Sequence, residues 1–83
     1  MNATDFAWLI EAPGPYYLAT RILANETEFH WTKDAGKALR FCSLQQASSV
    51  HYAVKKLVPT LFAFASVLTD AKPVEHGFVN SST

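Results

Sequence analysis

Apolar residues alternate with polar or small residues in three stretches of the first half of the chain, at 6–11, 16–23 and 28–32. An alternation of period two sends successive side chains to opposite faces of a sheet, so each stretch predicts a β-strand. Pro13 and Gly14 separate the first two stretches and predict a type II turn. The first two strands should therefore form an antiparallel hairpin, and a polar turn leads on to the third.

One amphipathic helix is predicted over 44–57. Ser43 is suited to cap its N-terminus, and Gln46 three residues later completes a capping box. Pro59 ends the helix because its ring and missing N–H disrupt the helical hydrogen bonds. Before the helix, residues 37–41 should re-enter the fold with Leu39 and Phe41 inward. One side of the helix is apolar at a period of 3.6 residues: Leu44, Ala47, Val50, His51, Val54, Leu57 and Val58.

Residues 61–68 predict a final long strand, and 73–79 predict a last extended segment that docks on the sheet. The polar residues 80–83 should form a disordered tail. The element order is then β-β-β-α-β. It predicts a single α+β domain over 1–79, with an antiparallel sheet of about four strands and one helix on one face.

The amino-acid composition bears on how the apolar faces of the predicted sheet are covered. Hydrophobic residues make up 49% of the chain, charged residues 17%, and the formal net charge is zero. These values exclude a strongly basic nucleic-acid binder and a disordered chain. The helix is about 21 Å long and 10 Å wide, whereas four strands span roughly 15–20 Å. Since nothing else in the sequence covers the second face, we expect a homodimer through the sheet or a bound host protein.

No catalytic, metal or cofactor site is predicted, and we expect a protein without enzymatic activity. Cys42 is the only cysteine, and no close pair of cysteines or histidines has the spacing of a zinc site. Cys42 precedes a helix N-terminus, a position that can lower the pKa of a thiol. The simpler interpretation is that Cys42 serves as a small apolar residue at the end of a strand. The lone thiol and the absence of a secretory signal predict a cytoplasmic setting, and no apolar run is long enough for a membrane span.

Aromatic and basic residues are the candidates for contacting a partner. Aromatic residues dominate interface hot spots, which directs attention to Tyr16, Tyr17, Trp31 and Tyr52, with Trp31 equally suited to the core. Residues 33–56 carry five basic side chains against one acidic residue, so a modest nucleic-acid-binding patch is the alternative function. Its members are Lys33, Lys37, Arg40, Lys55 and Lys56, and the last four are also candidates for contacting a protein.

A longer pattern joins these elements: Phe29-His30-Trp31-Thr32-Lys33-Asp34, then Ala38-Leu39-Arg40-Phe41, then Ser43 with Gln46-Ala47. It resembles short uncharacterised proteins encoded by bacterial phages and prophages, which read W-T-x-D … A-x-x-F-x-S-x-x-x-A. The runs 8–14 and 73–76 fit the same resemblance. The resemblance implies a small protein that binds a host protein, such as an anti-CRISPR inhibitor of a CRISPR-Cas effector. It carries over no functional residue.

Overall fold

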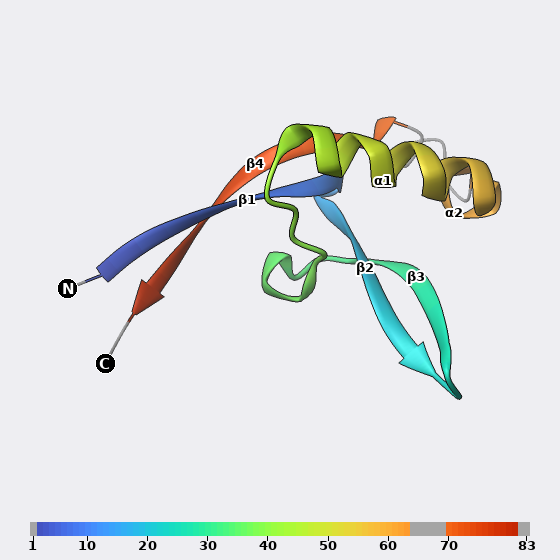
Figure 1. Ribbon diagram of the computed structural model, residues 1–83, viewed down its shortest axis with the longest axis horizontal. Helices are drawn as coiled ribbons and strands as arrows, with labels where there is room; N and C mark the ends of the chain where they lie inside the picture. The colour runs from blue at the N-terminus through green and yellow to red at the C-terminus, as the bar shows by residue number, and fades with distance from the viewer. Residues whose placement is uncertain (1, 64–69, 82–83) are drawn as a thin grey trace.

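The computed structural model describes the backbone of residues 2–63 and 70–81, and side chains within 6–62 and 70–78. Four strands form one antiparallel sheet in the order β3-β2-β1-β4, with the main helix packed against it (Figure 1). The predicted α+β class is confirmed. The strands are β1 (Asn2–Ala12), β2 (Tyr16–Leu23), β3 (Glu26–Thr32) and β4 (Lys72–Ser81).

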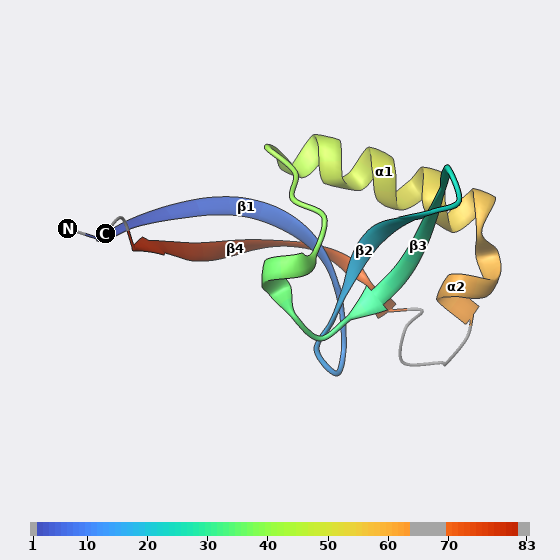
Figure 2. The same ribbon diagram turned by 90° about the horizontal axis from the view of Figure 1, so that it is seen from below.

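The sheet opens into two arms because its central strands barely pair. β1 pairs with β2 only at Glu11↔Tyr17 and Ala12↔Tyr16, on either side of the predicted turn, which contains a cis Gly14–Pro15 bond. β4 pairs with β1 along its whole length, and β3 pairs with β2 likewise. We call residues 2–7 and 76–81 the terminal arm, and residues 20–29 the hairpin arm; Figures 1 and 2 show them diverging.

A connecting segment fills the gap between β1 and β2. The Leu39 N–H donates to the Leu18 carbonyl at 3.0 Å, and Trp8 and Phe41 exchange two backbone hydrogen bonds of 2.9 Å. Phe41 is buried and Leu39 half-buried, as their predicted inward positions require. Before this segment lies a short 3-10 helix, η1 (Ala35–Lys37), whose N-terminus is capped by the Asp34 carboxylate.

This segment also corrects the expectation that nothing covers the second face of the sheet. Leu9 and Tyr17 point to the face opposite the main helix, where they pack with Ala38 and with Ala35 of η1. A loop placed between β1 and β2 can pack on this face because the two strands separate beyond their two paired positions. The large apolar side chains of the sheet that remain exposed therefore lie in the arms, at Phe6, Ile22 and Leu23, rather than over a whole face.

The main core lies on the other face, under α1 (Leu44–Leu57), whose predicted bounds are confirmed. Ala47 and Val54 are the buried centre of its apolar side. Leu44 and Leu57 were predicted to face the core but are exposed, because they lie at the two ends of the helix and at the margins of its apolar stripe. The buried residues of this cluster are Ile10, Ala12, Leu18, Phe41, Ala47, Val54, Phe62 and Ala71.

The C-terminal part differs most from the sequence prediction. Residues 61–63 belong to a second helix, α2 (Pro59–Ala63), so the predicted strand over 61–68 is wrong there; 64–68 lie outside the described residues. Proline is favoured in the first turn of a helix, where its missing N–H has no partner to lose. The fourth strand is β4, which extends to Ser81, so part of the predicted tail pairs with β1.

Candidate protein-interaction surfaces

Two of the four aromatic candidates are core residues. Tyr17 is 7% exposed and stacks on His76 with ring centroids 5.6 Å apart. Burial, together with the nearby carboxylate of Glu11, raises the pKa of the Tyr17 hydroxyl. The Trp31 indole N–H donates to the Leu61 carbonyl at 3.1 Å, and its ring meets Phe62 edge-on. Both side chains are occupied within the fold, as the core interpretation of Trp31 anticipated.

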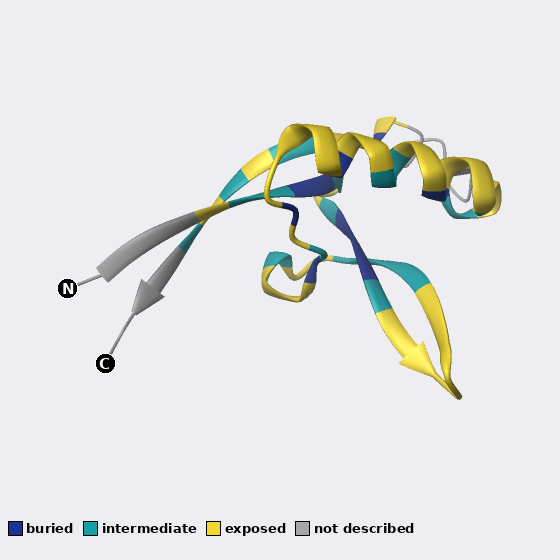
Figure 3. Cartoon of the chain, viewed as in Figure 1, coloured by how far each residue is buried: buried dark blue, intermediate teal, exposed yellow. Residues whose placement is uncertain are grey.

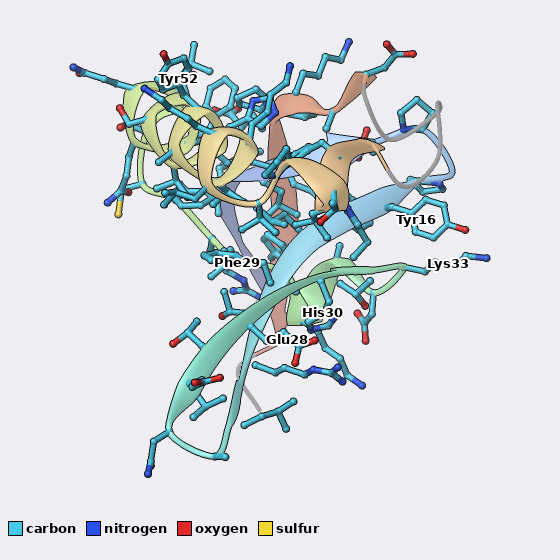
Figure 4. All side chains as sticks on the ribbon, turned by 90° about the vertical axis from the view of Figure 1, so that its right-hand side faces the viewer. Tyr16, Glu28, Phe29, His30, Lys33 and Tyr52 are labelled. Atoms are coloured by element: carbon cyan, nitrogen blue, oxygen red, sulfur yellow. The ribbon has the colours of Figure 1, made fainter. Side chains whose placement is uncertain are left out.

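Tyr16 and Tyr52 are the aromatic candidates that reach the surface. Tyr16 is half-buried and has the Lys33 ammonium 5.4 Å from its ring centroid; Figure 4 shows both side chains extending outward together. Tyr52 is 69% exposed on α1, with the Lys56 ammonium 5.9 Å from its ring. These cation–aromatic pairs lie on separate parts of the molecule, so they form no single surface.

The structure divides the basic candidates between two sides of the sheet. The Arg40 guanidinium lies 3.9 Å from the centroid of Phe78, a residue of the cluster opposite α1. Lys37 ends η1, which packs on that same cluster. Lys55 and Lys56 lie in the last turn of α1, on the other side. The segment that looked basic in the sequence therefore does not gather its charges on one face.

A row of stacked groups crosses the face opposite α1, and the sequence did not reveal it. Tyr17 stacks on His76, His76 meets Phe78 edge-on at 5.3 Å, and Arg40 covers Phe78. His76 and Phe78 are two residues apart in β4, and this spacing in the sequence indicates that their side chains share a face. The register that sets His76 opposite Ala7 depends on long-range pairing, which periodicity alone does not specify.

Large apolar side chains lie outside the core at the tip of the hairpin arm. Ile22 is 77% exposed and Leu23 49% exposed, and Figure 3 shows this region as exposed. The arm ends in a turn at Ala24 and Asn25 with φ values of 50° and 69°, the left-handed geometry of a type I′ hairpin turn. An exposed ion pair of 3.1 Å joins Arg21 to Glu28 across the two strands.

The side chains of β3 change from exposed at the tip of the hairpin arm to packed at its base. Nearer the junction, Phe29 points toward the helix side while Glu28 and His30 point to the opposite side (Figure 4). Phe29 and Trp31 both pack against the main core, as their predicted shared face requires. The residues from Glu26 to Glu28 are all exposed. Packed aromatic residues therefore anchor the base of the arm, while its tip presents apolar and charged side chains to the outside.

The cysteine and the helix cap form one local structure. The Ser43 hydroxyl accepts from the Gln46 N–H at 3.1 Å, which confirms the predicted N-cap. The Gln46 side-chain oxygen accepts from the Cys42 N–H at 2.9 Å, one residue earlier than a standard capping box predicts. The Cys42 thiol is free and exposed.

His51 lies half-buried on α1, with its ring centroid 5.4 Å from that of Phe62. Burial lowers its pKa, and the charge of Lys55 adds to this effect. Among the described residues, no group of three or more His, Cys, Asp or Glu side chains could hold a metal ion. Within the same part of the chain, no helix has the length and apolar character needed to cross a membrane.

The residues that carry the phage resemblance serve local structure. The Thr32 hydroxyl accepts from the Asp34 N–H, Asp34 caps η1, and Ser43 caps α1. Residues of the motif therefore have structural roles in turns and helix caps.

No protein-family model, curated protein or solved structure matches this chain.

Proposed function

We propose that this chain is a protein-interaction module that acts by binding rather than by catalysis, with the hairpin arm as its binding element. The observation that supports this most is the exposure of Ile22 and Leu23 on a projecting two-stranded ribbon. Adjacent residues of a strand point to opposite faces, so both faces of the tip are apolar. A partner that encloses the tip would therefore contact a large exposed apolar side chain on each face.

The surroundings of the tip resemble the organisation of a binding interface. Charged side chains flank Leu23 on its face of the ribbon, namely Arg21, Glu26 and Glu28, all of them exposed, while Thr20 and Thr27 flank Ile22 on the other face. An apolar centre within a polar rim is the usual anatomy of a protein interface. Full burial of an Ile or Leu side chain contributes about 1.5–3 kcal/mol, so a groove that accepts both residues would gain appreciable binding energy.

The partner we propose is a bacterial host protein that the chain inhibits. This part of the proposal depends on the resemblance to phage-encoded proteins, which implies inhibitors of host defence such as anti-CRISPR proteins. A hairpin arm that projects from a small core is suited to inserting into a groove or an active-site cleft. CRISPR-Cas effectors are therefore the first purified partners to test, alongside unfractionated bacterial lysate.

The test compares two exposed apolar sites. Tagged wild-type protein, the Ile22→Ser/Leu23→Ser variant and a Leu57→Ser control are each used to capture proteins from lysate and to bind purified effectors. Ile22 and Leu57 are exposed to a similar degree, 77% and 79%, so both changes should leave the fold intact. We expect a captured host protein to be lost with the arm variant and kept with the control. Equal capture by both variants, or no specific capture by wild type, would contradict the proposal.

A further inference from the structure

The outer edge of β4 carries a row of backbone groups that pair with no strand in 2–63 or 70–81, and the register identifies them. The N–H and C=O of Trp8 are both bonded to Phe41, so they point away from β4. In an antiparallel pair, residues opposite each other direct their polar groups either both toward one another or both away. Glu75, the partner of Trp8, therefore directs its N–H and C=O to the outer edge of the sheet.

The same alternation extends along the strand. Gly77, Val79 and Ser81 also direct their backbone groups outward, while the intervening residues bond to β1. β4 is the last strand of the sheet, and no strand in 2–63 or 70–81 pairs with this edge. Natural proteins usually protect an edge with bulges, prolines or lysines. The register of β4 is uninterrupted, and its only Lys and Pro are at its start, Lys72 and Pro73.

The terminal arm also lacks a third strand. Among the residues that the structure describes, 2–7 of β1 pair only with β4, so this part of the sheet is a two-stranded ribbon there. Isolated two-stranded ribbons are marginally stable in water. Each unpaired backbone group must otherwise be satisfied by water. A further strand added to the outer edge would satisfy the free groups and stabilise the arm.

We infer that the strand which pairs with this edge is β4 of a second copy, placed antiparallel across a two-fold axis at Phe78. In this register Gly77 faces Val79 of the other copy, and Glu75 faces Ser81, so the four outward residues from Glu75 to Ser81 are paired, while Pro73, which also lies outward, is outside this ladder. Registers centred on residues 76 or 77 would place Pro73, which has no N–H, opposite an outward residue. An axis at Gly77 would make as many hydrogen bonds, but it would leave the carbonyl of Ser81 opposite Pro73 without a donor. The axis at Phe78 is therefore the register that pairs every backbone N–H and C=O of Glu75, Gly77, Val79 and Ser81.

The chemistry near the axis favours a second copy as the partner. Phe78 would face its own symmetry mate in a non-hydrogen-bonded pair, and such aromatic cross-strand pairs are stabilising. The formal net charge of zero removes overall repulsion between copies. A two-fold axis also uses the same edge in both molecules. This arrangement moves the sheet-mediated dimer expected from the sequence from a face to an edge, and it does not involve the hairpin arm.

The decisive test is cysteine cross-linking in a Cys42→Ser background. With oxidised glutathione as oxidant, Phe78→Cys should form a covalent dimer, because facing Cα atoms in such a pair are about 4.5 Å apart, within disulfide range. Glu75→Cys is the matched control on the same strand. Its two copies would be offset by six residues, roughly 20 Å, and should stay unlinked. Equal cross-linking of both variants, or none with Phe78→Cys, would overturn the inferred register.

Phe78→Cys removes the aromatic ring that lies at the proposed axis, so a second measurement tests the dimer with that ring in place. Light scattering on unmodified protein over a dilution series should reach twice the chain mass of 9.2 kDa. Val79→Pro removes an outward N–H without removing a bond to β1, and should shift the protein to monomer with an unchanged circular dichroism spectrum. Wild-type protein that stays monomeric throughout, or a folded Val79→Pro variant that dimerises normally, would overturn the inference.

Discussion

Leu18 and Ile22 lie four residues apart on the same face of β2, yet Leu18 is fully buried and Ile22 is 77% exposed. Leu18 belongs to the core under α1, at the junction where β1, β2 and the connecting segment meet. Ile22 lies in the hairpin arm, beyond that cluster. Figure 3 shows the same contrast over the molecule. Stability is therefore concentrated at the junction, while the arms carry side chains and strand edges available for binding.

The largest expected difference in the free energy of unfolding is between substitutions of these two residues. Leu18→Ala should lower the free energy of unfolding by about 2–5 kcal/mol, because it removes buried methyl groups and leaves a cavity. Ile22→Ala should change it by less than about 0.5 kcal/mol, as is usual for an exposed site. Urea denaturation of both variants measures the difference. Similar losses for the two variants would mean that the arm is packed as tightly as the junction.

A smaller effect is expected at the entry to α1. Ser43→Ala removes the hydroxyl that accepts from Gln46 and should cost about 1 kcal/mol of stability. Ser48→Ala on the exposed side of the same helix is the matched control, and it should be neutral or slightly stabilising because Ala favours helix. Thermal unfolding of the two variants tests whether the cap supports the junction. If Ser48→Ala is the more damaging change, the cap has no such role.

A gain in stability is expected from the turn of the hairpin arm. Ala24 adopts a left-handed φ of 50°, which is costly for Ala and better tolerated by Asn. Ala24→Asn should therefore stabilise the protein by about 0.5 kcal/mol, measured by urea denaturation. If partner binding uses the arm as proposed, this variant should still bind, since Ile22 and Leu23 are unchanged. A loss of stability would show that the turn has another geometry in solution.

The smallest effect concerns pH. The pKa of His51 lies below its usual value, so the unfolded chain takes up a proton first as the pH falls through about 6.5. The contribution of His51 to stability is thus complete above that pH and declines as the pH falls toward the folded-state pKa. His51→Gln should reduce this slope in urea midpoints collected from pH 8 to pH 5. An unchanged slope would place the pH dependence on other groups.

Local patterns were sufficient to predict most elements. Alternation identified β2 and most of β3, but it gave β1 only over 6–11, whereas the strand begins at Asn2. The Ser43 cap together with Pro59 set both ends of α1. The apolar run at 61–68 was misread because a short apolar run has no periodicity that separates a strand from a buried helix. Pro59, predicted as a helix end, also begins α2.

The long-range features needed the structure. Periodicity does not show that β1 and β2 pair at only two positions, nor that residues 38–41 fill the gap between them. These two features decide which apolar residues are covered. They bury Tyr17 and leave Ile22 exposed, although both lie in one predicted strand. The candidate surface at the arm therefore depends on tertiary contacts rather than on side-chain type.

Amide hydrogen exchange tests the contrast between junction and arms most directly. Leu39 and Phe41 donate backbone hydrogen bonds at the junction, and Arg21 and Leu23 occupy paired positions in the hairpin arm. All four amides occupy sites in bonded ladders or bridges, so differences in exchange report local opening rather than missing bonds. We predict strong protection at the two junction amides and much faster exchange at the two arm amides. Equal protection at all four would contradict the division of the molecule into a stable junction and free arms.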